Sequence, residues 1–417
     1  MNCGADRAVT RGGDDVTAND TGGGEFDPYR VALAGLLRCC EPPVPEQVAR
    51  FVAGLGARGA WEAIAGRSAP KSVAQVVDAR LGALDAAALT ARAEADLRSA
   101  AAAGAVVLGP DDLEWPAECF MGLDHVRPHD RCVHAAVPLA LYRRGDRWPV
   151  TRRGSAAVVG SRSATPYGVR VASDLGAGLA DRGVTVVSGA AFGVDAAAHR
   201  GALHAGTAAG ARECPSGVTV AVLACGIDRA YPVAHRLLLD AATACGSVVS
   251  EYPPGAVPAR HRFLVRNRLI AAFGEATVVV EAGRRSGSLN TATTAGGLSR
   301  QVLAVPGPVS SAMSVGCHDL IRDQKASLVT DAGDVVGLLG PLQPAAPVHR
   351  GGSRPTDGLD LLTARVHEAL PARGTATVDE ISVEAGLSMR EVLGALATLH
   401  LDGLAVKHDG GWGRCAV

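Results

Sequence analysis

Arginine is concentrated in the segment from Tyr252 to Cys317. This segment contains seven Arg, no Lys and no Asp, and its only acids are Glu275 and Glu281. Most of these arginines stand beside Gly, Ser or Asn, residues that offer backbone N–H groups and short polar side chains to a phosphate. The pattern therefore predicts a surface for an anionic ligand, and the repeated guanidinium groups indicate several phosphates rather than one.

Two stretches of this segment carry most of the arginines. In FLVRNRLIAAF, which begins at Phe263, Arg266 and Arg268 stand two apart and cannot share one face of a helix. We expect one of them to point into a crevice and the other elsewhere. In GRRSGSLNTA, Arg284 and Arg285 precede a Ser-Gly-Ser turn whose N–H groups open the next helix, which is typical of a phosphate cradle. A solvated charged turn is the alternative.

Two earlier loops are rich in glycine. Gly160, Ser161 and Arg162 follow an apolar run and precede a helix, so backbone N–H groups, a hydroxyl and a guanidinium come together as a phosphate site requires. Ordinary turn chemistry explains the same tripeptide when it is taken alone. In SGAAFGVD, Gly189 and Gly193 would let the backbone approach a ligand closely. The first loop lacks the GxGxxG fingerprint of a dinucleotide site.

Short apolar, β-branched runs alternate with helical stretches from Ser155 onward. Strands that are apolar on both faces and alternate with helices predict an α/β fold with a Rossmann-like, doubly wound parallel sheet. Ligands bind such sheets at the carboxyl ends of the strands, and every loop named above falls at one of these ends. The predicted strands span residues 155–160, 184–189, 218–225, 246–251, 276–282 and 302–306.

The rest of the chain divides by composition. An Ala-rich stretch with apolar residues at three- and four-residue spacing predicts a helical domain. A Pro- and Gly-rich stretch is typical of a linker, and three helices followed by a hairpin at Asp409 and Gly410 resemble a winged helix. We expect a disordered tail (1–27), a helical domain (28–103), a Rossmann-like domain (104–340, core 155–339), a linker (341–358) and a winged-helix domain (359–417).

Charge and motif content exclude several classes of function. The formal net charge of -1 gives no argument from overall basicity, so only local patches count. Arg outnumbers Lys 38 to 3; a GC-rich genome explains that ratio but not the clustering. GxSxG, HExxH and the Walker loop are all missing from the sequence, so it offers no recognisable catalytic constellation.

Metal sites and membranes are also disfavoured. The ten Cys show no CxxC spacing, so we expect no metal site, and no motif calls for a cofactor. No apolar run reaches about 18 residues, the length that a spanning helix needs. The N-terminus lacks the apolar core of a signal peptide. We therefore expect a cytoplasmic protein without a membrane partner.

Taken in order, the motifs resemble those of the DprA/Smf family of DNA-processing proteins. The resemblance covers roughly Ser155 to Leu339 through VVGSR, GVDAAAH, VAVLACGIDRAYP, SEYPPG, RFLVRNRLIA, SGSLNTA and GCHDLI. It implies a Rossmann-like, non-enzymatic protein that binds single-stranded DNA without sequence specificity. It also implies a homodimer formed through the Rossmann domain, and a partner, the recombinase RecA, that the protein helps to load during natural transformation and homologous recombination.

The resemblance also assigns site residues. The family's phosphate site falls on the GSR tripeptide, and its basic pocket falls on the arginines of RFLVRNRLIA and on the SGS turn. Many members carry Arg in the second loop where this chain has Phe192, so one expected phosphate contact is lost. The expected DNA-binding set is Gly160, Ser161, Arg162, Gly189, Gly193, Arg262, Arg266, Asn267, Arg268, Arg285, Ser286, Gly287 and Ser288.

Two alternatives remain open. The first is a nucleotide-cleaving enzyme related to the cytokinin-activating phosphoribohydrolases, which carry PGGxGTxxE with a catalytic Glu where this chain has GRRSGSLNTA. The second is a transcription regulator that uses the winged helix. It is weakened because SMREVLGALATLH, the stretch expected to form the recognition helix, has one Arg, one Glu and one His.

Overall fold

The computed structural model describes residues 26–82, 84–126, 136–145, 154–208, 218–339, 359–371 and 374–415. The expected tail lies almost entirely outside these residues, and the expected linker over 341–358 lies wholly outside them. The chain divides into two compact units, Met1–Pro344 and Ala345–Val417. Among the described residues, no helix is long and apolar enough to cross a membrane.

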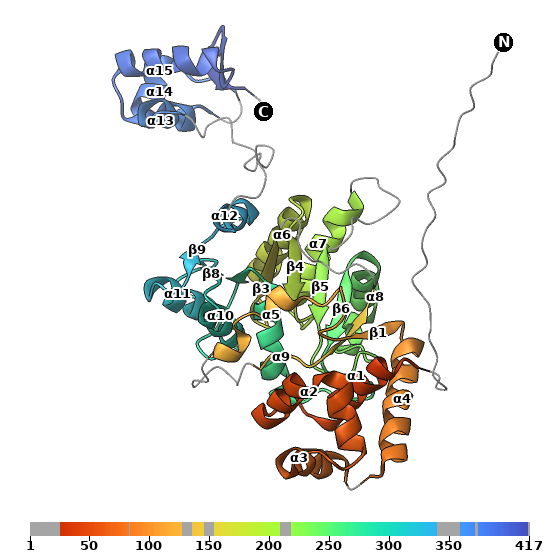
Figure 1. Ribbon diagram of the computed structural model, residues 1–417. Coiled ribbons are helices and arrows are strands. Elements are labelled where there is room, and N and C mark those ends of the chain that lie inside the picture. The colour runs from red at the N-terminus through yellow and green to blue at the C-terminus, as the bar shows by residue number, and fades with distance from the viewer. Residues whose placement is uncertain are drawn as a thin grey trace, which may run out of the picture. The chain divides into compact units, whose positions relative to one another are not determined.

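A single large sheet organises the first unit (Figure 1). Within the described residues it has nine strands in the order β1-β2-β6-β5-β4-β3-β7-β8-β9. Every neighbouring pair in the run β6-β5-β4-β3-β7-β8-β9 is parallel. At the edge, β1 pairs antiparallel with β2, and β2 pairs antiparallel with β6. The six predicted strands are confirmed as β3 to β8. The strands are β1 (Ala105–Leu108), β2 (Leu141–Arg144), β3 (Ser155–Val159), β4 (Thr185–Ser188), β5 (Thr219–Val222), β6 (Ser247–Ser250), β7 (Ala276–Val279), β8 (Gln301–Ala304) and β9 (Ser327–Leu328).

Helices cover both faces of the sheet, which confirms the doubly wound α/β fold. Alternate residues of β3 enter different cores: Ala156 and Val158 pack with α6, α7 and α12, whereas Ala157 and Val159 pack with α9 and α10. The first face carries α6 (Pro166–Asp181), α7 (Val194–Ala208), α8 (Arg236–Cys245) and α12 (Ala332–Leu338), and the second carries α5 (Ala117–Phe120), α9 (Arg260–Phe273), α10 (Ser288–Gly297) and α11 (Val315–Arg322).

The strand order reverses at β3. From β3 the chain moves outward through β4, β5 and β6, and it then returns through α9 to β7 on the other side of β3. The connections that leave β3 and β7 therefore run to opposite faces of the sheet. Such a reversal opens a crevice at the carboxyl ends of the two strands, where ligands of open α/β sheets bind.

The predicted N-terminal helices are present and gather at one end of the sheet (Figure 1). The first begins where Asp27 accepts a hydrogen bond from the Tyr29 N–H at 3.2 Å and Pro28 occupies the first helical turn. These helices share one apolar cluster with Tyr142, Ala221 and Leu223, so their core continues into the sheet. They are α1 (Pro28–Cys39), α2 (Glu46–Ala65), α3 (Lys71–Leu81) and α4 (Ala86–Ala102).

The second unit has the predicted winged-helix order, with three helices and then a hairpin. Reciprocal capping boxes, Thr377 with Glu380 and Ser388 with Glu391, begin its second and third helices. Gly386 ends the second helix in the left-handed conformation at φ 62°. The elements are α13 (Leu361–Ala369), α14 (Val378–Ala385), α15 (Met389–Leu401), β10 (Ala405–His408) and β11 (Gly411–Arg414).

A buried ion pair joins α9 to the end of β6. Arg268 donates to both carboxylate oxygens of Glu251 at 2.8 and 2.7 Å, and its Nε donates to the Ala136 carbonyl at 2.8 Å. The two charged side chains are 2% and 1% exposed. Because every strong donor and acceptor has a partner, the pair is tolerated inside the protein and holds α9 against the sheet.

We predict that Arg268→Met lowers the free energy of unfolding by about 3–5 kcal/mol, because Glu251 is left charged and buried without a partner. The double variant Arg268→Met/Glu251→Leu should recover part of this loss. Urea unfolding of both variants and the parent protein measures the difference. An equal loss in the single and double variants would show that Arg268 acts through packing rather than through its charge.

Candidate nucleic-acid interface

A cleft of about 920 Å³ lies at the carboxyl edge of the sheet. Its walls come from the loop after β3, the loop after β7 and one side of α9, which are the elements that the reversal at β3 brings together. Among its lining residues the one carboxylate is Asp195, and the remaining charge is guanidinium. The arginines are Arg162, Arg260, Arg266, Arg284 and Arg285.

Four of these five arginines are free to bind a ligand. Their side chains are exposed, and within the described part of the chain they have no hydrogen-bond or ion-pair partner. Guanidinium groups present planar pairs of N–H donors that match phosphate oxygens. The cleft is therefore electropositive. The four are Arg162, Arg260, Arg284 and Arg285.

The GSR loop after β3 is fastened to its neighbours by its backbone. The Ser161 N–H donates to the Glu281 carbonyl at 2.8 Å, and the Ser161 carbonyl accepts the Val194 N–H at 3.2 Å. The Ser161 hydroxyl accepts the Ser163 N–H at 3.1 Å. One backbone N–H of this loop is thus already used inside the protein, whereas the Arg162 side chain is exposed.

The two glycines of the next loop provide close packing. Gly193 has φ 77°, and a Cβ at this position would overlap the Ser161 and Arg162 carbonyl groups. A Cβ at Gly189 would overlap the Arg266 guanidinium. Both glycines let the backbone approach other protein groups closely. The expectation of close approach to a ligand therefore needs correction, because the space beside each glycine is filled by the protein.

Arg266 forms part of the cleft floor but is 3% exposed. Its Nη1 donates to the carbonyls of Gly189 and Val222 at 2.8 and 2.5 Å, at the ends of β4 and β5. Burial lowers the pKa of Arg266 to about 10, so the group stays protonated at neutral pH. Burial raises the pKa of Asp195, and the charge of Arg266 opposes that rise. Arg266 thus supports two strand ends and adds positive charge beneath the cleft.

The Ser-Gly-Ser turn lies at the start of α10 and is held by α9. The Asn267 Nδ2 donates to the Gly287 carbonyl at 3.2 Å, and the hydroxyls of Ser286 and Ser288 are 2.7 Å apart. Asn267 and all three turn residues line the cleft, with the exposed side chain of Arg285 next to them. The structure thus brings this predicted group together with Arg162.

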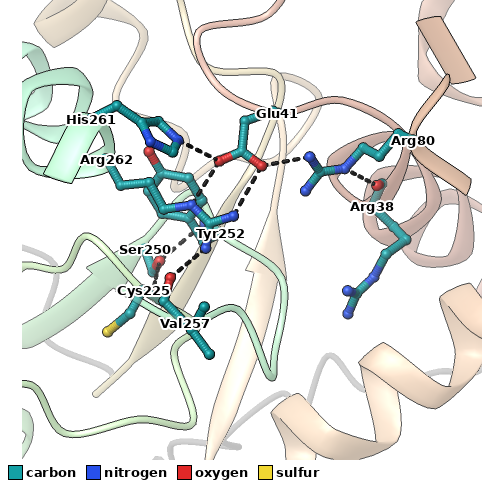
Figure 2. A network of polar contacts seen from close by, with 9 residues as sticks. All are labelled: Arg38, Glu41, Arg80, Cys225, Ser250, Tyr252, Val257, His261 and Arg262. Carbon is teal, nitrogen blue, oxygen red and sulfur yellow. Dashed lines mark hydrogen bonds and ion pairs between the residues drawn. The ribbon is translucent and has the colours of Figure 1, made fainter. Parts of the chain in front are cut away.

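Two predicted arginines, like Gly189 and Gly193 above, lie outside the cleft lining. Arg262 donates to both oxygens of Glu41 at 2.7 and 3.1 Å, and Glu41 also accepts from Arg80 (Figure 2). Arg268 is the partner of Glu251 described above. The expectation that these arginines face a phosphate is corrected by their placement, because a protein carboxylate already satisfies each guanidinium.

Sequence reasoning missed a wall of the cleft formed by Arg260 and aromatic side chains. The Arg162 guanidinium lies 4.5 Å from the Phe263 ring centroid, and the Tyr231 and Phe263 centroids are 5.5 Å apart. Helical spacing could have identified part of this wall, because Arg260, Phe263 and Asn267 stand three and four residues apart. Arg284 also lines the cleft, but the predicted set included only its neighbour Arg285.

Comparison with known proteins identifies the family. The family model "DNA recombination-mediator protein A" matches residues 108–340, and "DprA winged helix domain" matches residues 352–411. A "putative DNA processing protein DprA" from Mycobacterium tuberculosis is 45% identical over 392 residues, which are 93% of this chain and 95% of that protein. The chain belongs to the DprA family. The resemblance found in the sequence is thereby confirmed.

A solved DprA structure shares the fold. The X-ray structure of DprA from Streptococcus pneumoniae matches with a TM-score of 0.56 and 28% identity, covering 75% of this chain and 98% of that one. DprA from Helicobacter pylori, whose structure was described for its single-stranded DNA-binding mode, matches with a TM-score of 0.46 and 23% identity, covering 56% and 95%.

The glycine contacts give a prediction about the cleft wall. Gly193→Ala should lower the free energy of unfolding by about 1–3 kcal/mol, because the new methyl group meets fixed carbonyls at a φ that favours glycine. Gly287→Ala is the matched control: nothing lies within 4 Å of its added Cβ, so stability should change little. Urea unfolding compares the two variants. Equal stability of both would contradict the close contact between the two loops.

Proposed function

We propose that this DprA family member binds single-stranded DNA in the cleft, without sequence specificity and without catalysing a reaction. The observation that carries the proposal is the set of four exposed arginines around one cleft of about 920 Å³, none of which has a hydrogen-bond or ion-pair partner among the described residues. Guanidinium groups bind phosphate oxygens, which are the same at every nucleotide. Such a site tracks a DNA backbone and does not read its sequence.

Aromatic side chains in the same cleft favour a single strand over a duplex. Tyr231 is 41% exposed and contacts Phe263, and both rings line the cleft beside Arg162. A flat ring can stack on an unpaired base, whereas the bases of a duplex are already stacked on one another. Arg162 and Phe263 together present charge for a phosphate and a face for a base.

The phosphoribohydrolase alternative lacks a suitable acid. The one carboxylate lining the cleft is Asp195, which is buried, accepts the Ala191 N–H at 3.4 Å and faces Arg266. The loop after β7 reads GRRSGSLNTA and contains no acid, whereas the enzymes carry their catalytic Glu in this loop. A general acid or base must reach the proton that it transfers. We therefore propose a binding protein rather than a hydrolase.

The net charge of the winged-helix domain weakens the alternative that the protein is a transcription regulator. Residues 359–417 contain eight Asp or Glu and five Arg or Lys, so the unit is net acidic. Its third helix, α15, starts with Met389 and Arg390 and exposes Leu393, where a DNA-reading helix needs several polar or basic side chains. An acidic unit is repelled by phosphates. We propose that DNA binding belongs to the first unit.

We also propose that the protein forms a homodimer through its Rossmann domain. We further propose that its partner is RecA, which it helps to load on single strands. The support is family membership, since the matching family is named as a recombination mediator. A dimer fits the binding role, because two clefts on one particle engage one strand with a higher effective concentration than either cleft alone.

We predict that the purified protein binds an oligo-dT strand more tightly than a duplex of equal length. The log-log slope of affinity against salt should be about -0.7 per phosphate neutralised. Arg162→Ala should weaken binding and make this slope shallower by about 0.7, because one exposed guanidinium is removed. Fluorescence anisotropy titrations at several salt concentrations measure both quantities.

Two variants serve as controls for the arginine test. Arg170→Ala removes the same charge from α6, where the side chain is 85% exposed and outside the cleft lining, so binding should change little. Arg262→Ala removes an arginine that Glu41 holds, so it should lower stability and leave the salt slope unchanged. Equal effects of the Arg162 and Arg170 variants would contradict a defined site in the cleft.

We further predict that deleting residues 359–417 leaves dimerisation and single-strand binding largely in place, since all the cleft arginines lie in the first unit. Light scattering and oligo-dT titration of the truncated protein test both statements. Stimulation of RecA assembly on an oligo-dT strand tests the partner. A monomeric truncation, or one that no longer binds DNA, would place the essential surface in the winged helix.

A further inference from the structure

Phe192 is an exposed aromatic residue at the rim of the cleft. Its side chain is 49% exposed, although aromatic side chains are costly to leave in water. It follows Ala191, which lines the cleft, and precedes Gly193, which packs against the backbone of the GSR loop. Phe192 is therefore next to the DNA site without being part of its lining.

The Phe192 ring rests on a fixed support. It meets the His235 ring at a centroid distance of 4.7 Å and an interplanar angle of 64°. His235 is 3% exposed, and its Nδ1 lies 2.9 Å from the Ala190 carbonyl oxygen. The loop that carries Phe192 is tied to the GSR loop by the hydrogen bond from Val194 to Ser161. A ring held in this way loses little conformational entropy when a ligand covers it.

Phe192 also extends a series of flat groups along this edge of the sheet. The cleft wall already contains the contacts of Arg162 with Phe263 and of Phe263 with Tyr231. Tyr231 and His235 belong to the same connection between β5 and α8, and His235 supports Phe192. The series is provided by four separate segments of the chain, so its presence does not follow from any single motif.

We propose that Phe192, supported by His235, is a stacking site for an unpaired base of the strand whose phosphates bind the cleft arginines. This inference rests on the proposed function and adds a second kind of contact to it. A ring in this loop contributes affinity through the base rather than through the phosphate charge. Because every base has a flat face, the contact does not depend on sequence.

The test compares Phe192→Ala with the parent protein on two ligands: oligo-dT and an abasic chain with the same number of phosphates. Binding of oligo-dT should weaken by about 5- to 150-fold, the range for loss of one base–aromatic contact. Binding of the abasic chain and the salt slope should not change. Loss of affinity for both ligands, or for neither, would overturn the stacking site.

Two further variants separate stacking from simple hydrophobic contact. Phe192→Leu keeps an apolar side chain without a flat face, so it should bind oligo-dT nearly as weakly as the Ala variant. Leu237→Ala removes another exposed apolar side chain, 83% exposed and two residues after His235, and should bind oligo-dT like the parent. Full affinity of the Leu variant, or equal losses from Phe192→Ala and Leu237→Ala, would overturn the proposal in favour of an apolar patch.

Phe192→Arg tests whether the strand passes this loop. It should bind the abasic chain more tightly than the parent and steepen the salt slope by about 0.7. No change in either quantity would overturn the proposal. Failure of the proposed function gives a different result, because the parent protein would then not bind oligo-dT at all. Thermal unfolding of each variant confirms that the fold is retained.

Discussion

The reversal of strand order at β3 is the constraint on which the site depends. Parallel strands need crossover connections, and the connections on the two sides of β3 must cover opposite faces of the sheet. The loops after β3 and β7 are consequently adjacent at their starts and diverge beyond them. Arg162 and the Ser-Gly-Ser turn at Ser286, far apart in sequence, thus line one cleft. Neither loop alone would form it.

The basic helix α9 mainly supports the strand ends beneath this cleft. Its central arginines are both buried: Arg266 donates through Nη1 to two strand-end carbonyls, and Arg268 donates to the buried carboxylate of Glu251. A guanidinium suits this role because its several donors can satisfy groups from separate strands at once. Further toward the C-terminus, Arg300 donates to the carbonyls of Ala271 and Gly274. Many arginines of this segment therefore stabilise the fold, and the exposed ones are available to a ligand.

The division between buried and exposed arginines explains how a protein of net charge -1 presents a strongly positive site. Acidic partners neutralise the structural arginines, as Glu41 does for Arg262 and Glu251 does for Arg268. Acids are almost absent from the cleft lining, so the charge there is not compensated. A locally focused field of this kind attracts phosphates without making the whole surface basic.

The sequence by itself determined the six central strands, the helices between them and the edge of the sheet at which the cleft lies, because short runs that are apolar on both faces and alternate with helices form a parallel sheet. The edge strands β1, β2 and β9 were not predicted. The β2 and β9 sequences, LYRR and SL, are short and partly polar, and the apolar β1, AVVL, stands before the alternation of strands and helices that begins at Ser155. Only the tertiary structure decided which arginines are free. Arg262 meets Glu41 across 221 positions of sequence, and such pairs depend on how elements pack rather than on spacing.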